Sequence, residues 1–428
     1  MVCRKLILLL FFAWSHAALS DTALPEAGLD THEGVASCAT SVCHGKVSPD
    51  PTSTVWLNEY RIWLRQDYHS RAYKTLQTAQ SKDIARKLGL PAAHTAKICL
   101  DCHTDNVANE ARGRRFQISD GVGCEGCHGG AGRWLESHAE QGTSHTDNLA
   151  AGMYPTEDPI ARARLCLSCH LGTESKFATH AIMGAGHPRL AFELETFTVN
   201  QPRHYAVDAD YRDRKPAISS VNMWLAGLAV TSLHSLELLQ EEWFSKPGLV
   251  PELSFYQCHA CHHPMGDLRW QAEPDGLAPG SVRLNDGTLV VLAEVLNALE
   301  PGSGAALAKG LALLHTASLR DRGAVSAAAE ALHGNIEPLA ERFARESYAE
   351  SDLRTLRRAL LSRAEAGRFR HFTSAEQVFL AVETLSISLG DADRLTQPLD
   401  SWFASVEEDD PFVPKQFAVL AGNVLEAL

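Results

Sequence analysis

Paired cysteines followed directly by histidine recur through the first two thirds of this 428-residue chain. All of its 11 cysteines except Cys3 belong to such pairs. The five motifs are CATSVCH (Cys38, Cys43, His44), CLDCH (Cys99, Cys102, His103), CEGCH (Cys124, Cys127, His128), CLSCH (Cys166, Cys169, His170) and CHACH (Cys258, Cys261, His262).

A C-x-x-C-H run is typical of covalent haem attachment, because the two thiols add to the porphyrin vinyl groups and the adjacent histidine binds the iron. The first motif has four residues between its cysteines instead of two, but its four regular companions favour the same chemistry. Disulfides would not explain the histidines, and zinc ribbons do not need them. The sequence therefore predicts five covalently bound haems c, with these five histidines as proximal metal ligands.

An iron held by two imidazoles needs a second histidine, and the local sequence favours five candidates. His69 lies in VWLNEYRIWLRQDYHSRAYKTL, whose apolar spacing predicts an amphipathic helix. His138 follows glycines that can turn the chain back after the third motif, and His180 and His187 flank a Gly-Ala-Gly turn. His234 lies in the apolar run VNMWLAGLAVTSLHSLELL, where it is either a ligand or a core residue.

The other histidines receive weaker predictions. His94 and His204 are secondary ligand candidates, and His259 and His263 are expected at a haem edge or behind a ligand. The histidines expected on the surface are His32, His145, His315, His333 and His371.

The amino end has the pattern of an export signal. Arg4 and Lys5 precede an apolar run from Leu6 to Trp14, and small residues follow where a signal peptidase can cut. The run is about half of the roughly 20 apolar residues that a membrane anchor needs. We therefore expect residues 1–20 to be removed and the mature protein to be periplasmic, or extracellular, and not membrane-spanning.

The charge of the chain limits its partners. Without residues 1–20 there are 37 Lys and Arg against 52 Asp and Glu, a net charge of −15. Such an excess of acid disfavours nucleic acid as a partner. It favours redox proteins with a basic docking face.

Two domains are expected after the signal, and the fold class is mostly α. Residues 21–275 would form the haem domain, with short helices and long loops around five apolar macrocycles that replace much of the side-chain core. Residues 276–428 would form an α-helical bundle that either supports the haem domain or docks a partner. The helices expected there are 288–299, 303–315, 323–333, 336–348 and 412–427, one from a cap at Ser351 to a stop at Gly367, and one from a Ser374/Gln377 capping box to Gly390.

Several segments resemble the cytochrome c-554 family of multihaem cytochromes. They are W-x-x-x-x-x-HSRAYKTL, CLDCH, DGVGCEGCHGGAGRWLESH and CLSCHLG. The longer pattern, with THAIMGAGHPRLAFELETF, PRHY and FYQCHACHHPMGDLRWQ, is similar to a bacterial pentahaem subgroup with a helical carboxyl-terminal region, and the resemblance covers residues 36–272.

The resemblance implies some of the ligand pairs. It implies His138 opposite His44 and His69 opposite His128. It also implies a five-coordinate iron on His103, unless His94 is the second ligand of that iron. The chain departs from the family in the spacing of its first motif and in its fifth motif.

Electron transfer is the leading functional hypothesis, because an iron with two imidazole ligands exchanges one electron and has no position left for substrate. A membrane quinol-oxidising protein is a candidate donor. The alternatives are an enzyme that reduces or oxidises a small nitrogen or sulfur compound at a five-coordinate haem, and a subunit of a haem filament.

Overall fold

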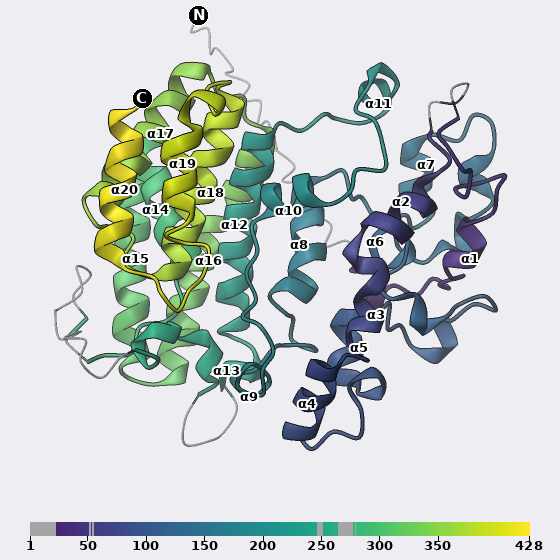
Figure 1. Cartoon of the computed structure of the whole chain (residues 1–428), viewed down its shortest axis with the longest axis horizontal. Helices are drawn as coiled ribbons and strands as arrows, with labels where there is room; N and C mark the ends of the chain where they lie inside the picture. Colours follow the sequence, from purple (N-terminus) through teal and green to yellow (C-terminus); the bar gives the residue numbers. More distant parts are fainter. Residues whose placement is uncertain (1–22, 51–52, 54, 246–250, 264–276, 279) are drawn as a thin grey trace, which may run out of the picture.

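The computed structural model describes residues 23–50, 53, 55–245, 251–263, 277–278 and 280–428 (Figure 1). The expected export signal lies outside these residues. Within them the chain is mostly helical and contains no β-strand, only the isolated bridges His32–Arg112, Gly172–Phe177 and Tyr256–Leu284. The predicted mostly-α class is confirmed.

The part of the chain that carries the first four motifs forms short helices joined by loops. In Figure 1 helices α1–α7 lie together on one side of the molecule. The helices before residue 215 are α1 Val35–Cys38, α2 Glu59–Gln66, α3 Ala72–Thr75, α4 Ala79–Lys87, α5 Lys97–His103, α6 Glu125–His128, α7 His145–Ala150, α8 Pro159–His170, α9 His180–Gly184, α10 Leu194–Asn200 and α11 Ala209–Arg214. Short 3-10 turns lie between them, at Pro25–Ala27, Tyr68–Arg71, Ala93–Thr95, Asn109–Ala111, Ile118–Asp120, Ala131–Arg133 and Ser137–Ala139.

The carboxyl-terminal helices are longer and lie side by side on the other side of the molecule (Figure 1). From residue 220 onward the helices are α12 Ser220–Leu238, α13 Glu242–Ser245, α14 Gly287–Leu299, α15 Pro301–Ser318, α16 Arg322–Arg345, α17 Glu350–Glu365, α18 Phe372–Ser388, α19 Thr396–Phe403 and α20 Pro414–Glu426. The 3-10 turns among them are Leu253–Phe255, Cys258–Ala260 and Asp393–Leu395.

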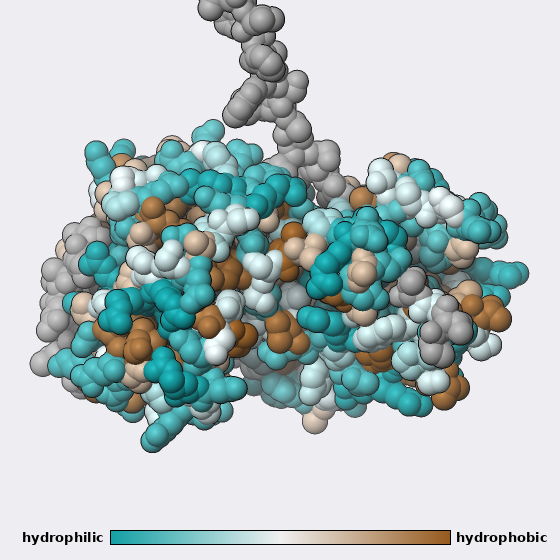
Figure 2. Space-filling model, turned by 90° about the horizontal axis from the view of Figure 1, so that it is seen from above, coloured by the Kyte–Doolittle hydropathy of each residue, from teal (hydrophilic) through white to brown (hydrophobic). Residues whose placement is uncertain are grey.

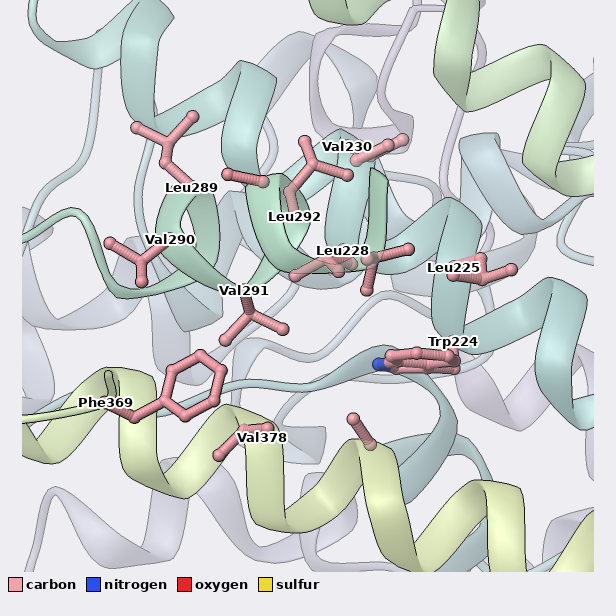
Figure 3. Packing of buried hydrophobic residues seen from close by; sticks show 14 of the residues in the cluster. Trp224, Leu225, Leu228, Val230, Leu289, Val290, Val291, Leu292, Phe369 and Val378 are labelled. Carbon is pink, nitrogen blue, oxygen red and sulfur yellow. The ribbon is translucent and has the colours of Figure 1, made fainter. Parts of the chain in front are cut away.

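Helix α12 is the centre of the apolar core. It is apolar on all sides and packs against α8, α14, α16 and α18, because a helix without a polar face is stable only when it is surrounded. Figure 3 shows Trp224, Leu225 and Leu228 of α12 beside residues of α14 and α18. The core begins at Ile160 in α8, so it extends across the domain boundary expected at residue 275.

Helix ends agree with the sequence where glycine stops a helix and disagree where serine was expected to start one. Gly367 and Gly390 follow α17 and α18 with φ of 73° and 71°, a conformation that glycine adopts without strain. Ser351 lies inside α17, and Ser374 lies inside α18, where its hydroxyl donates to the carbonyl of His371. Gln377 donates instead to the carbonyl of Phe192. Both predicted caps are therefore wrong.

Two helices were expected at 323–333 and 336–348, but one helix, α16 Arg322–Arg345, is continuous across residues 334–335, with Pro338 inside it. Its apolar face against α12 and α15 continues on both sides of residues 334–335. Helix α19 was not predicted.

A buried ionic group joins α14 to α15. The Asp286 carboxylate accepts hydrogen bonds from Nε of Arg283 at 3.0 Å and Nε2 of His315 at 2.9 Å, and all three side chains are buried. Burial alone would raise the pKa of Asp286, but the His315 hydrogen bond and the Arg283 charge hold that pKa well below its usual range. His315 was expected on the surface; that prediction is wrong, because it supplies a partner for this carboxylate.

The surface in Figure 2 is mostly hydrophilic, with apolar residues in small separate patches. Across the described ranges, none of the helices has both the length and the apolar content needed to cross a membrane.

Candidate functional site

The five motifs close locally in the same way. In the third motif the His128 N–H donates to the Cys124 carbonyl at 2.9 Å, and in the fifth the His262 N–H donates to Cys258 at 2.8 Å. This bond forms one helical turn, which brings the first cysteine and the histidine to one side of the chain.

The longer first motif makes the equivalent bond. The His44 N–H donates to the Cys38 carbonyl at 3.1 Å, across two additional residues. The CX4CH loop therefore returns its histidine to the position beside the first cysteine that the regular motifs reach by a helical turn.

Each motif histidine faces one histidine from elsewhere in the chain. The distances between ring centroids are 6.1 Å for His44 and His138, 6.3 Å for His103 and His187, 6.2 Å for His128 and His204, 6.3 Å for His170 and His69, and 6.0 Å for His262 and His180. No histidine is shared between two of these pairs.

This separation fits one metal ion between two imidazoles. A metal lies about 2.0 Å from an imidazole nitrogen. The nitrogen lies about 1.1 Å from the ring centre, given ring bonds of about 1.33 Å. Two rings on opposite sides of an iron therefore need centroids about 6.2 Å apart. The observed spacings match this value, so the residues present fit an iron with two axial histidines.

The pairs differ in part from those that the family resemblance implies. His138 lies opposite His44, as implied. His69 lies opposite His170 and not His128, because the chain turns at Asp67 after α2 and carries His69 toward α8. His103 faces His187, while His94 packs edge-on against Tyr73 at 6.4 Å.

His234 is not brought against a motif histidine. Its Nε2 lies 2.5 Å from the Gly172 carbonyl and its Nδ1 lies 3.1 Å from the Glu237 carboxylate. His204, a secondary candidate from the sequence, takes the place opposite His128. It comes from a loop that precedes α11, and its sequence signal is the PRHY segment of the family resemblance.

Several ring nitrogens are held in place by hydrogen bonds from Nδ1. His44 Nδ1 lies 2.9 Å from Glu59 and His69 Nδ1 lies 2.8 Å from Asp67, both carboxylates. The acceptors of three others are backbone carbonyls: Ala72 for His103 at 3.1 Å, Trp134 for His138 at 3.0 Å and Pro188 for His187 at 2.8 Å. A proton fixed on Nδ1 leaves Nε2 with its lone pair for a metal.

Burial keeps three motif histidines neutral. It lowers the pKa of His128 to about 3. It lowers the pKa of His170 to about 4, with a smaller contribution from His69, and it also lowers the pKa of His103. Neutral imidazole is the form that binds a metal, so these rings need not lose a proton to do so.

The motifs lie close to one another. The Cys38 thiol contacts that of Cys124, and the Cys102 thiol contacts that of Cys169. Cys127 of the third motif lies near Cys166 and Cys169 of the fourth. The first motif is thus beside the third, the second beside the fourth, and the third near the fourth.

Glu125, inside the third motif, holds the first and third motifs together. Its buried carboxylate accepts the backbone N–H groups of Glu33 and Gly34, both at 2.7 Å, and that of Ala131 at 2.8 Å. Next to it, His32 is buried and lies 2.7 Å from the Asp105 carboxylate. The prediction of His32 on the surface is therefore wrong. Neither contact could be predicted from local sequence, since both join segments far apart in the chain.

The described residues contain neither a disulfide nor a cluster of three or more possible metal-ion ligands. The ten cysteines outside the first 22 residues are all free thiols. In the same ranges no three or more His, Cys, Asp or Glu side chains gather as a metal-ion cluster, whereas a structural zinc ion takes four such ligands.

Residues 37–129 match the family model described as cytochrome c554 and c-prime. The matched part contains the first three motifs. The match is limited to this part of the chain, and it supports a c-type cytochrome, with covalently bound haem c and a role in electron transfer. The fourth and fifth motifs lie beyond the match. No curated protein and no solved structure matches the chain.

Proposed function

We propose that this protein is an exported multihaem cytochrome that transfers electrons through five covalently bound haems, each with two histidine ligands. The observation that carries the proposal is the set of five histidine pairs, one for each cysteine motif, at the spacing that an iron requires. The proposed ligand pairs are His44 and His138, His103 and His187, His128 and His204, His170 and His69, and His262 and His180.

This ligand set keeps four of the five distal histidines expected from the sequence and replaces His234 with His204. Support for the replacement comes from the ring spacing at His128 and from the two hydrogen-bond partners of His234. The ten cysteines would tether the porphyrins, including Cys38 and Cys43 of the longer motif, which makes the same closing hydrogen bond as the regular motifs.

The bound iron would supply one-electron exchange. The protein would contribute the ligands of the iron and the hydrogen bonds that orient them. The two histidines of each pair would hold the iron and exclude substrate from it, and the Nδ1 hydrogen bonds of His44, His69, His103, His138 and His187 fix those rings so that little reorganisation would accompany a change of charge. His187 opposite His103 favours electron transfer over the enzyme hypothesis, which needs an open position on the His103 iron.

The contacts among motifs support a continuous path for electrons. The first motif adjoins the third, the third is near the fourth, and the fourth adjoins the second. The short segment from His180 to His187 then joins the fifth and second sites, since it supplies one ligand to each pair. The proposed order is therefore first, third, fourth, second and fifth.

The export pattern of residues 1–20 supports a periplasmic location, where this path would connect a membrane quinol-oxidising donor to a soluble or outer-membrane acceptor. The excess of acidic residues favours a partner with a basic docking face.

A haem count combined with low-temperature EPR tests the proposal. Mass spectrometry should give five haems per chain, and the oxidised protein should show only low-spin ferric signals. Four haems would remove the CX4CH site from the proposal. A high-spin ferric signal in the native protein would show an open iron and would favour the enzyme hypothesis.

A further inference from the structure

We propose that Glu59 and Asp67 are positioning residues that lower the reduction potentials of the first and fourth haems by accepting hydrogen bonds from the ligands His44 and His69. The inference rests on the proposed function, because it requires these two histidines to bind iron. It goes beyond that function by distinguishing the first and fourth irons from the second, whose ligands His103 and His187 meet backbone carbonyls.

The first observation is the contrast between the Nδ1 partners. Glu59 and Asp67 present carboxylates to His44 and His69 at 2.9 and 2.8 Å. The partners of His103, His138 and His187 are neutral backbone carbonyls. Among these five rings, only His44 at the first site and His69 at the fourth therefore meet an anion.

The second observation is that both carboxylates are held in position. The other oxygen of Glu59 accepts the backbone N–H of Leu57 at 2.9 Å. In Asp67, Oδ1 also accepts the backbone N–H of His69 at 3.0 Å, and Oδ2 accepts from Gln201 at 3.2 Å. Each carboxylate is thus oriented before any metal binds, and neither can turn away without losing a second hydrogen bond.

The third observation is burial. The side chains of Glu59 and Asp67 are only 15% and 8% exposed, so solvent screens their charges weakly. Each carboxylate also accepts a backbone N–H, which favours its anionic form.

The consequence for the iron follows from charge. A carboxylate that accepts the Nδ1 proton makes the imidazole a stronger electron donor to its metal. The ferric state carries one more positive charge than the ferrous state, so a stronger donor and a nearby anion both stabilise the ferric state. Hydrogen bonding and local charge are recognised means of setting haem potentials. The first and fourth haems should therefore be reduced at lower potential than they would be with carbonyl partners.

The test uses Glu59→Gln and Asp67→Asn, which keep an oxygen acceptor of nearly the same shape and remove the charge. In a redox titration followed by haem absorbance, each variant should increase the equilibrium constant for reduction of one haem about tenfold, which is 59 mV for one electron. The low-spin EPR signal of one iron should shift in each variant, because the ligand field of one imidazole changes.

Glu350→Gln is the matched control. It removes one carboxylate charge from the exposed Glu350–Arg354 pair on α17, among the carboxyl-terminal helices. All five potentials and EPR signals should be unchanged in this variant. A shift of similar size there would overturn the inference, since it would show an effect of net charge alone.

Different results would contradict this inference and the proposed function. Five low-spin haems with potentials unchanged in Glu59→Gln and Asp67→Asn would overturn the inference and leave the function intact, whereas fewer haems in the native protein would remove the function itself. If Glu59→Gln fails to retain its haem, Glu59→Asp, which keeps the charge, should restore both the haem and the low potential. Recovery of the haem at a raised potential would overturn the inference.

Discussion

Replacement of His204 by alanine tests the ligand that the sequence ranked low. The His204 ring lies edge-on to His128, with centroids 6.2 Å apart, which is the spacing calculated for a shared iron. Without it, that iron would keep one imidazole and become five-coordinate. Because the chain has five motifs, we expect one fifth of the ferric iron to become high-spin.

Low-temperature EPR measures this fraction directly. The haem count should stay at five, because Cys124 and Cys127 still tether the porphyrin. Added imidazole should enter the space left by the side chain and convert the high-spin signal back to low-spin. Such recovery would show that the change is a missing ligand and not general unfolding.

His234→Ala is the control, because His234 was an equal candidate by sequence but contacts Gly172 and Glu237 instead. It should leave every iron low-spin. The reasoning from ring spacing would be refuted if His234→Ala produced the high-spin signal and His204→Ala did not.

Further predictions concern the longer motif, the buried ionic group and the core. Alanine in place of both Cys38 and Cys43 should remove both thioether links of the first haem, so mass spectrometry of the denatured protein should count four covalently bound haems; a count of five would contradict the assignment of this motif. Asp286→Asn should lower the free energy of unfolding by about 3–5 kcal/mol, measured with denaturant, because it leaves the Arg283 charge buried without its anion. The pKa of Asp286 is lowered in the folded protein. Its carboxylate therefore stabilises the fold above about pH 4, the usual pKa of an aspartate in an unfolded chain, and this stabilisation is lost as the pH falls further. Equal loss of stability in acid for the native protein and the variant would contradict this. Leu292→Ala, at a fully buried position, should cost about 2–5 kcal/mol of unfolding free energy, whereas Leu313→Ala, 57% exposed on α15, should change it by less than about 0.5 kcal/mol.

The sequence predicted well what depends on neighbouring residues. The five Cys/His motifs are local, and each closes with a hydrogen bond between its own first cysteine and histidine or within a short helix. Gly367 and Gly390 stop helices because a positive φ is a property of one residue. The helical region after residue 287 follows from apolar periodicity, although the serine caps within it were wrong because Ser374 bonds backward to His371.

The long-range partners could not be predicted in the same way. Every histidine pair joins residues far apart in the chain, and several histidines had equally suitable local surroundings. His32 and His315 were assigned to the surface, yet both are buried beside carboxylates from distant segments. Asp67 is an exception that local sequence could have indicated, since it lies two residues before His69.

The sequence by itself determined the number and chemistry of the attachment motifs, because two thiols and a histidine act within one turn of chain. Only the tertiary structure decided which second histidine faces each motif and which of those rings meet a carboxylate. The physical reason is that a ring spacing of about 6 Å depends on how α2, α8 and the loops around them pack. That packing is determined by burial and by hydrogen bonds between distant segments, such as those that the Glu125 carboxylate accepts from Glu33 and Gly34.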